Sequence, residues 1–249
     1  MKIDRSTAIV TGAARGLGHG IVRGLLRRGA RRVYALDRDL ADIEPIETGL
    51  ASRCVWVTCD VTSQEDIDRV AARFGDADLL VSNAGMSACQ GLLAGASIDA
   101  AAPEIEVNYL GALRVFRAFV PMLRQHRPSA MLVVVSSLAR AAIPDLGSYC
   151  VSKAALLKAV EILRAELAPS GVHVLAALPG AVDTAMIRNL SIPKMTVDEA
   201  VAIMLDALEA GDAEVLVGDE AVQAERAYRH DPAGVPAPRD RPSRARRVD

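Results

Sequence analysis

Tyr149 and Lys153 are the two residues in this chain of 249 whose types and spacing suggest chemistry most directly. On a helix, side chains four residues apart share a face, so the phenol and the ammonium would project into the same space. A free tyrosine has a pKa of about 10, and a neighbouring positive charge lowers the pKa of a phenol. Tyr149 could then take a proton from an alcohol or donate one to a ketone. The same spacing also fits an ordinary half-buried helix with a solvated lysine.

A glycine-rich segment near the amino terminus favours the chemical interpretation. Residues Thr11–Gly18 read TGAARGLG, follow the apolar run Ser6–Val10 and precede helical spacing of apolar residues in Gly16–Arg28. A strand, a glycine turn and a helix make a dinucleotide site, because glycine lets the backbone approach a pyrophosphate and the helix amino terminus presents N–H groups. The spacing GxxxGxG departs from GxGxxG, so the generic fingerprint is not matched.

Several short motifs follow one another in an order that is more specific than any one of them. They are Thr11-Gly12-(x3)-Gly16-Leu17-Gly18, Asp60-Val61, Asn83-Ala84-Gly85, Asn108, Ser136-Ser137, Tyr149-(x3)-Lys153 and Pro179-Gly180-(x3)-Thr184. In this order they resemble the short-chain dehydrogenase/reductase family over nearly the whole chain, to about Ala221. The resemblance implies an NAD(P)-dependent oxidoreductase that interconverts a secondary alcohol and a ketone by hydride transfer, with Tyr149 as general acid/base.

The resemblance also implies a role for each residue of a catalytic set. A serine hydroxyl binds the substrate oxygen, Tyr149 exchanges the proton, and Lys153 holds the nicotinamide ribose and lowers the pKa of the tyrosine. Asn108, on a helix distorted at that point, supports a water that links the lysine to solvent. The family's usual spacing of thirteen residues before the tyrosine indicates Ser136 as the serine, whereas alignment of the preceding strand indicates Ser137. We expect Ser137, with one residue deleted from the following loop, because loops tolerate deletions better than strands.

The second predicted strand ends in an acid that bears on the choice of cofactor. Asp37 lies nineteen residues beyond Gly18, close to the spacing of about 20 expected for an acid that binds the adenosine ribose. A carboxylate accepts the ribose hydroxyls and repels a 2′-phosphate, which favours NAD over NADP. Arg15 and Arg38 keep NADP as the alternative, because a guanidinium binds phosphate. The residues expected to bind the cofactor are Thr11, Gly12, Arg15, Gly16, Leu17, Gly18, Asp37, Asp60, Val61, Asn83, Ala84, Gly85, Tyr149, Lys153, Pro179, Gly180, Val182 and Thr184.

The elements that must position these residues alternate along the chain. Strands are predicted near Ala8, Val33, Val55, Leu79, Leu132, Val174 and Val215, with helical stretches between them. This alternation predicts an α/β fold, a Rossmann-like doubly wound parallel sheet of about seven strands with helices on both faces. Residues 1–230 are expected to form a single domain that holds both the dinucleotide site and the catalytic site. Residues 231–249 contain four prolines and five arginines, and are expected to form a flexible tail.

Composition and charge argue against other function classes. The net charge of −2 gives no general attraction to nucleic acid or to an anionic membrane. No apolar run approaches the length of a membrane span, and the amino terminus has no apolar signal core. A cytoplasmic enzyme is therefore expected. The four cysteines have no metal-ligand spacing, so we expect free thiols and no metal.

Substrate and assembly are less closely specified. The residues expected to face the pocket are mostly apolar and favour an apolar ketone or secondary alcohol: Met86, Leu138, Ala139, Ile143, Pro144, Tyr149, Ala181 and Met186. The predicted lid, Asp183–Met195, carries Arg188 and Lys194, which could accept a carboxylate. The resemblance implies a homodimer formed through two long helices, and the unusual carboxyl-terminal sequence leaves a tetramer open.

Two alternatives stay open at the level of the sequence. One is a cofactor-binding regulatory or interaction protein on the same fold, with the tail contacting a partner. The presence of Asn108, Ser137, Tyr149 and Lys153 argues against it, because a binding module has no need of all four. The other is a ketoacyl reductase acting on a carrier-bound substrate, which the expected NAD preference disfavours.

Overall fold

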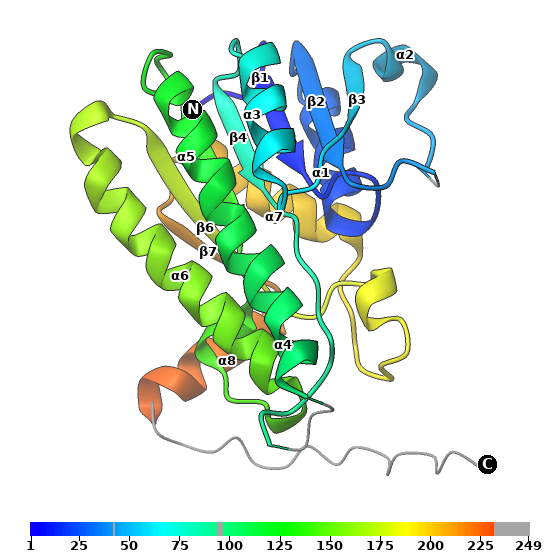
Figure 1. The fold of residues 1–249 in the computed structure, drawn as a ribbon, viewed down its shortest axis with the longest axis vertical. Coiled ribbons are helices and arrows are strands. Elements are labelled where there is room, and N and C mark those ends of the chain that lie inside the picture. Colours follow the sequence, from blue (N-terminus) through cyan, green and yellow to red (C-terminus); the bar gives the residue numbers. More distant parts are fainter. Residues whose placement is uncertain (42, 94–96, 232–249) are drawn as a thin grey trace.

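The computed structural model describes residues 1–41, 43–93 and 97–231. Its centre is a sheet of seven parallel strands in the order β3-β2-β1-β4-β5-β6-β7, which confirms the predicted fold class (Figure 1). The strands are β1 (Thr7–Thr11), β2 (Arg32–Asp37), β3 (Cys54–Thr58), β4 (Leu79–Ser82), β5 (Ala130–Val134), β6 (His173–Pro179) and β7 (Glu214–Val217). All of the tail predicted at 231–249 except its first residue lies outside the described residues.

Helices connect the strands. The longer ones are α1 (Gly16–Arg27), α3 (Gln64–Arg73), α4 (Ile98–Ile105), α5 (Ala112–Leu123), α6 (Gly147–Leu167), α7 (Val197–Ala210) and α8 (Asp219–His230). Shorter ones are α2 (Thr48–Ala51), the π-helix η1 (Glu106–Gly111) and the 3-10 turns η2 (Ser137–Arg140), η3 (Pro144–Leu146), η4 (Ala168–Ser170) and η5 (Ala185–Ile187). None of the helices in the described part of the chain is long and apolar enough to cross a bilayer.

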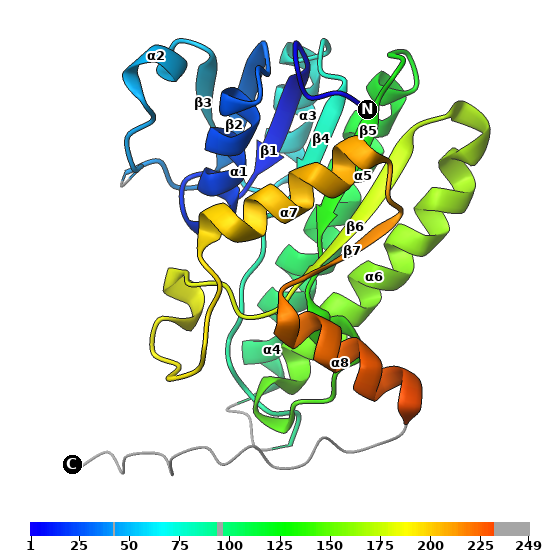
Figure 2. The same cartoon turned by 180° about the vertical axis from the view of Figure 1, so that it is seen from behind.

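Helices cover both faces of the sheet. Figure 1 looks onto the face under α3, α5 and α6, and Figure 2 shows α7 and α1 on the other face. Successive residues of β1 serve the two sides, because side chains alternate along a strand. Ile9 packs into the cluster under α5 and α6, whereas Ala8 and Val10 pack under α1 and α7. Each large side chain buried in this way, such as Phe116, contributes roughly 1.5–3 kcal/mol to folding.

The strand order reverses between β1 and β4, which are neighbours at the centre of the sheet. The chain runs outward from β1 through β2 to β3, and from β4 through β5 and β6 to β7. Parallel sheets bind ligands in the crevice outside the carboxyl ends of the strands at such a reversal. The glycine turn after β1 and the Asn83 motif after β4 both lie at this point.

Candidate active site

The turn after β1 is shaped by contacts that leave no room for larger residues. Gly12 and Gly16 have φ angles of 63° and 56°, in the left-handed region that favours glycine. A Cβ on Gly18 would lie 1.9 Å from the carbonyl oxygen of Gly12. A Cβ on Gly12 would lie 2.8 Å from Cα of Ala84. The spacing GxxxGxG therefore forms a tight turn although it departs from the commoner pattern.

Thr11 and Asn83 join this turn to the end of β4. The side-chain Nδ2 of Asn83 donates to the carbonyl oxygens of Thr11 and Gly12 at 3.0 and 2.9 Å. The hydroxyl of Thr11 accepts from the backbone N–H groups of Asn83 and Ala84 at 3.0 and 3.1 Å. Asn83 lies 72 residues after Thr11 and 71 after Gly12 in the chain. These hydrogen bonds therefore hold the glycine turn and the end of β4 together.

The amino terminus of α1 fits a phosphate group. Arg15 is its N-cap residue and makes no side-chain cap, and the first turn holds no acidic residue. The first N–H groups of a helix have no partner within the helix, and they carry the positive end of the helix dipole. Together with the glycine turn, whose backbone a ligand can approach closely, this arrangement fits the pyrophosphate of a dinucleotide.

Asp37 lies at the carboxyl end of β2, as expected for a ribose-binding acid. Its Oδ2 accepts the N–H of Ala14 at 3.0 Å and its Oδ1 accepts the N–H of Asp39 at 3.2 Å. Arg15 lies beside it and pairs with Asp39 at 3.4 Å. All of these side chains and Arg38 line the same cavity. The adenosine end of the site thus contains carboxylates and guanidinium groups together.

Tyr149 and Lys153 lie in the first two turns of α6, one turn apart. Lys153 Nζ donates to the carbonyl oxygen of Val134 at 3.2 Å and lies 5.8 Å from the centre of the Tyr149 ring. The lysine is only 3% exposed. The structure therefore brings the two residues onto one face of the helix, as the spacing predicts.

Burial dominates the acidity of this pair. It raises the pKa of Tyr149 to about 12, and a hydrogen bond with Ser136 acts in the opposite direction. It lowers the pKa of Lys153 from 10.5 to about 8. The lowered tyrosine pKa expected from the lysine charge is not found, because burial disfavours the charged phenolate and is the largest effect on this pKa. The hydroxyl of Tyr149 is thus protonated at neutral pH.

Asn108 lies in the π-helix η1, where the helix is distorted as expected, and is fully buried. Its Nδ2 donates to the carbonyl oxygen of Met86 and to Ser152 Oγ, both at 2.9 Å, and its Oδ1 accepts the N–H of Met86 at 2.8 Å. Ser152 Oγ in turn donates to the carbonyl oxygen of Tyr149 at 2.8 Å. Asn108 therefore connects the loop after β4 to the helix that carries the tyrosine.

Two serines follow β5, and hydrogen bonding from Ser136 acts to lower the pKa of Tyr149 against the effect of burial. The backbone of Ser136 is extended, with φ 173° and ψ 150°, so it prolongs the line of the strand. Its hydroxyl also accepts the N–H of Leu138 at 3.1 Å. The chain turns only at Ser137, the first residue of η2. Ser137 lines the cavity as well, so the choice between the two serines stays a prediction.

One cavity of about 540 Å³ holds nearly the whole predicted set. Every residue expected to bind the cofactor lines it except Thr11, which supports the turn from behind. Ser136, Ser137, Tyr149 and Lys153 line it too, whereas Asn108 acts from outside its wall. Of the expected substrate residues, Met86, Leu138, Ile143, Tyr149, Ala181 and Met186 line the cavity, and Ala139 and Pro144 do not.

The segment over the cavity is closed at its base by backbone contacts. The N–H of Asp183 donates to the carbonyl oxygen of Met195 at 2.8 Å. The N–H of Met195 donates to the carbonyl oxygen of Ala181 at 2.9 Å. Lys194 Nζ lies 3.8 Å from Asp183 and donates to the carbonyl oxygen of Arg188 at 3.2 Å. Neither basic side chain lines the cavity. The expectation that they receive a carboxylate gains no support.

Four residues of the site were missed by sequence reasoning. Glu220 lines the cavity from α8, and Arg140 contacts that helix. Glu104 is fully buried one turn before Asn108, and Ser152 bonds Asn108. Helical spacing could have indicated Glu104 and Ser152, since they lie four residues before Asn108 and three after Tyr149. The position of α8 has no comparable local signal.

Comparison with known proteins decides the family. The family model described as short chain dehydrogenase matches residues 6–194. The chain belongs to the short-chain dehydrogenase family. It is therefore an NAD(P)-dependent oxidoreductase.

Individual members of the short-chain dehydrogenase family align over most of the chain. A 1-deoxy-11-beta-hydroxypentalenate dehydrogenase of Streptomyces avermitilis is 34% identical over 88% of this chain and 90% of its own. A short chain dehydrogenase of Burkholderia cenocepacia, solved in complex with NADP, is 43% identical, with a TM-score of 0.87 over 93% of this chain and 95% of its own. An alcohol dehydrogenase of Thermococcus sibiricus, complexed with 5-hydroxy-NADP, is 29% identical, with a TM-score of 0.75 over 85% and 95%.

Proposed function

We propose that this short-chain dehydrogenase interconverts an apolar secondary alcohol and the matching ketone, with Tyr149 as the general acid/base. The observation that carries the proposal is the single cavity that joins the glycine turn after β1 to Tyr149, Lys153 and Ser136. A nicotinamide cofactor, when bound, supplies or accepts the hydride. The chain itself must then bind the carbonyl oxygen and move one proton.

The residues divide this work by position. For reduction, the neutral Tyr149 hydroxyl donates the proton to the substrate oxygen, and its raised pKa keeps it protonated at neutral pH. Ser136, which contacts Tyr149, holds the same oxygen by a hydrogen bond. Lys153 faces the ribose end of the cavity and takes up its positive charge more readily when an oxygen ligand is near. Asn108 and Ser152 fix the backbone that carries the tyrosine.

We propose NAD as the preferred cofactor, because the Asp37 carboxylate lies where the adenosine ribose hydroxyls would bind. NADP is the second candidate, supported by two observations. Arg15 and Arg38 line the same end of the cavity, and the Burkholderia cenocepacia relative is solved with NADP. In this chain Arg15 pairs with Asp39. This ion pair partly neutralises the arginine charge that would otherwise attract a phosphate.

The substrate end favours a neutral, apolar molecule. Its walls are formed mainly by aliphatic side chains, and among them Glu220 brings a carboxylate to the cavity. A negative charge on this wall repels acidic substrates. A carboxylate substrate is therefore disfavoured, in contrast to the expectation from Arg188 and Lys194.

We also propose a homodimer. Leu110 on η1 and Val151 and Ile162 on α6 expose apolar side chains by 37%, 50% and 53%. Exposed apolar groups of this size commonly mark a contact surface. Light scattering on the purified chain should give twice the monomer mass, and a monomer at micromolar concentration would contradict this.

The proposed reaction is tested by absorbance at 340 nm with NAD and NADP in parallel, against a panel of secondary alcohols and the matching ketones. Turnover with an apolar member of the panel, faster with NAD, is expected. Tight NADH binding in a fluorescence titration without any turnover would favour the regulatory alternative. Turnover restricted to carrier-bound ketoacyl substrates would favour a ketoacyl reductase.

A further inference from the structure

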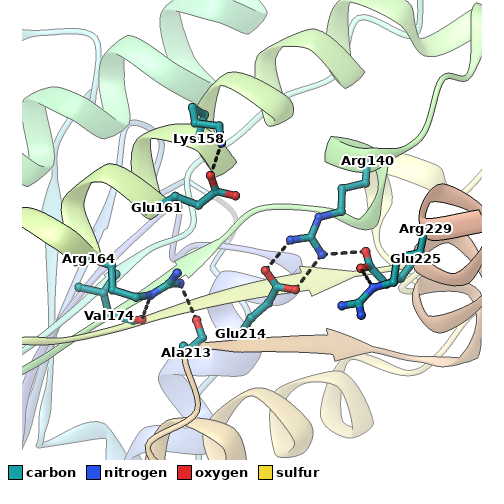
Figure 3. Close-up of polar contacts among 9 residues, drawn as sticks. All are labelled: Arg140, Lys158, Glu161, Arg164, Val174, Ala213, Glu214, Glu225 and Arg229. Carbon is teal, nitrogen blue, oxygen red and sulfur yellow. Dashed lines mark hydrogen bonds and ion pairs between the residues drawn. The ribbon is translucent and has the colours of Figure 1, made fainter. Parts of the chain in front are cut away.

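Arg140 connects three elements at one guanidinium group. It is the last residue of η2, the turn that begins at Ser137. Its Nη1 and Nη2 donate to the two carboxylate oxygens of Glu214, each at 2.7 Å, and Nη1 also donates to Glu225 at 2.7 Å (Figure 3). Two parallel bonds of this kind fix orientation as well as distance. The serine turn, the edge strand β7 and helix α8 are therefore held together at this point.

The cluster is largely removed from water. The side chains of Arg140, Glu225 and Glu214 are 16%, 9% and 30% exposed. Burial acts to raise the pKa of Glu225, but the hydrogen bonds and charges of Arg229 and Arg140 hold it below its ordinary value. Glu225 is thus ionised at neutral pH, and Arg140 pairs with both carboxylates. Removing one partner of a buried ion pair leaves the others uncompensated.

The same helix reaches the cavity at its other end. Glu220, in the first turn of α8, lines the cavity and accepts the backbone N–H of Ala181 at 3.1 Å. A Cβ on Gly180 would lie 3.2 Å from the backbone nitrogen of Ala221, so the two segments pack closely. Glu225, which Arg140 binds, lies five positions after Glu220 in the same helix. Helix α8 therefore contacts both walls of the substrate end.

We infer that α8 braces the substrate end of the cavity and that Arg140 is the positioning residue that sets it in place. By holding Glu225, Arg140 holds the helix so that Glu220 fixes the backbone at Ala181. The serine turn and the segment after β6 are thereby kept at a fixed separation. The catalytic part of this inference rests on the proposed function, whereas the mechanical coupling does not.

Two arginines of the same region serve as matched controls. Arg164 joins α6 to the same edge of the sheet, donating to the carbonyl oxygens of Val174 and Ala213 at 3.3 and 2.7 Å, and neither of these bonds reaches α8 (Figure 3). Arg229 bonds Glu225 at 2.6 Å, and its side chain is 76% exposed. Arg164→Gln and Arg229→Gln therefore remove an arginine from this region while leaving Arg140 in place.

The first test measures amide hydrogen exchange in the full chain. In Arg140→Met, exchange of the Ala181 amide is expected to rise about tenfold, because its partner Glu220 is no longer held. Arg164→Gln should stay within about twofold of the wild type, and Arg229→Gln, which leaves Arg140 bound to Glu225, should rise clearly less than Arg140→Met. Arg140→Lys, which keeps the charge but loses the two-point bond, should show the same local rise to a smaller extent, and it serves if Arg140→Met does not fold. Unchanged exchange at Ala181, or an equal rise in the controls, overturns the inference.

The second test separates substrate binding from cofactor binding. With a substrate that the wild type turns over, Arg140→Lys should lower kcat/KM by about 10- to 100-fold, mainly through KM, since displaced groups position substrate poorly. The dissociation constant for NADH should stay within about twofold. A raised exchange rate with wild-type KM overturns the positioning role. If the wild type itself turns over nothing, the proposed function fails, and the exchange measurement still decides whether α8 is a brace.

Discussion

Glu104 and Asn108 hold the same loop from consecutive turns of one helical segment. Glu104 Oε1 accepts the N–H of Ala88 at 2.6 Å, while Asn108 Oδ1 accepts the N–H of Met86 at 2.8 Å. Glu104 is fully buried, and its second oxygen, Oε2, has no hydrogen-bond partner among the described residues. A carboxylate in this position affects its surroundings strongly, since little water is present to screen it.

Replacing Glu104 by glutamine should shift the pH profile of alcohol oxidation. Its charge, with Cys150 and Cys89, adds to burial in raising the pKa of Tyr149, against the hydrogen bond from Ser136. The amide oxygen of glutamine still accepts the loop N–H, so mainly the charge is lost. Alcohol oxidation requires an unprotonated tyrosine, so its rate increases with pH. In the variant this increase should occur at a pH lower by roughly 0.5–1 unit.

The control for this shift is Glu106→Gln, two residues away on the same segment. Glu106 pairs with Arg114 at 2.7 Å and is 38% exposed, so its charge is screened by solvent. Its profile should match that of the wild type. Equal pH profiles for the two variants would show that the charge of Glu104 does not affect the pKa of Tyr149.

Tyr149→Phe should abolish turnover while leaving NADH binding nearly intact. The ring keeps its packing in the cavity wall, and only the hydroxyl that exchanges the proton is lost. Loss of a general acid lowers the rate by about 100- to 10,000-fold. The assay at 340 nm and a fluorescence titration with NADH measure the two effects separately. Wild-type turnover in this variant would disprove the mechanism.

Ser136→Ala and Ser137→Ala distinguish the two candidates for the substrate-binding serine. Ser136 contacts Tyr149, so its loss should lower kcat by about 100-fold, the effect of removing one donor to the reacting oxygen. Ser137→Ala should retain activity within about tenfold. The opposite ranking would restore the assignment made from strand alignment.

Asp37→Ala should relax discrimination against NADP. The carboxylate repels a 2′-phosphate, and without it the ratio of kcat/KM for NADP to that for NAD should rise by about 10- to 100-fold. Asp37→Asn keeps an acceptor for the N–H of Ala14 and separates the charge from that structural contact. An unchanged ratio in both variants, with a rise in Asp39→Ala, would show that the charge of Arg15 decides cofactor choice.

Lys153→Met should stabilise the protein while it removes activity. Burial lowers the pKa of Lys153 in the folded protein to about 8 from 10.5, so the unfolded chain binds more protons between these values. The cost of the buried ammonium is therefore complete below pH 8 and declines as the pH rises to 10.5. Removing it should add roughly 2–3 kcal/mol to the free energy of unfolding at pH 7, and less at pH 10.

Denaturant titrations at the two pH values measure this difference. Lys158→Met, on the same helix, is the control, because its side chain is 71% exposed. It should change the free energy of unfolding by less than about 0.5 kcal/mol. A Lys153→Met protein that is less stable than the wild type at pH 7 would contradict the assigned cost.

The sequence was sufficient for elements that local chemistry specifies. All seven strands were predicted, because each is a short apolar run between turn residues, and parallel strands buried on both faces need such runs. The glycine turn was predicted despite its unusual spacing, because the tight turn requires glycine at positions such as Gly12 and Gly18, and glycines are visible in the sequence. The four-residue spacing of Tyr149 and Lys153 was sufficient to predict that the two side chains lie on the same face of the helix.

Features that depend on long-range packing were not accessible in this way. Strand alignment indicates Ser137, and it carries no information on the extended backbone that Ser136 adopts. The lysine charge was expected to set the acidity of Tyr149, but burial depends on the whole fold and has the larger effect. Glu220 reaches the cavity only because α8 returns to it, and no short pattern reports such a return.

The π-helix Glu106–Gly111 has a consequence for how this site can change. A π turn accommodates one residue more than an α turn. Deleting a single residue there would restore a regular helix in which the flanking segments keep their facing, whereas the residues within the turn would shift by one position. Asn108 would lose Met86 or Ser152, although the helix itself would become more regular. The position of Asn108 therefore depends on the number of residues in this helical segment. Substitutions keep that number, so only deletions or insertions test this dependence.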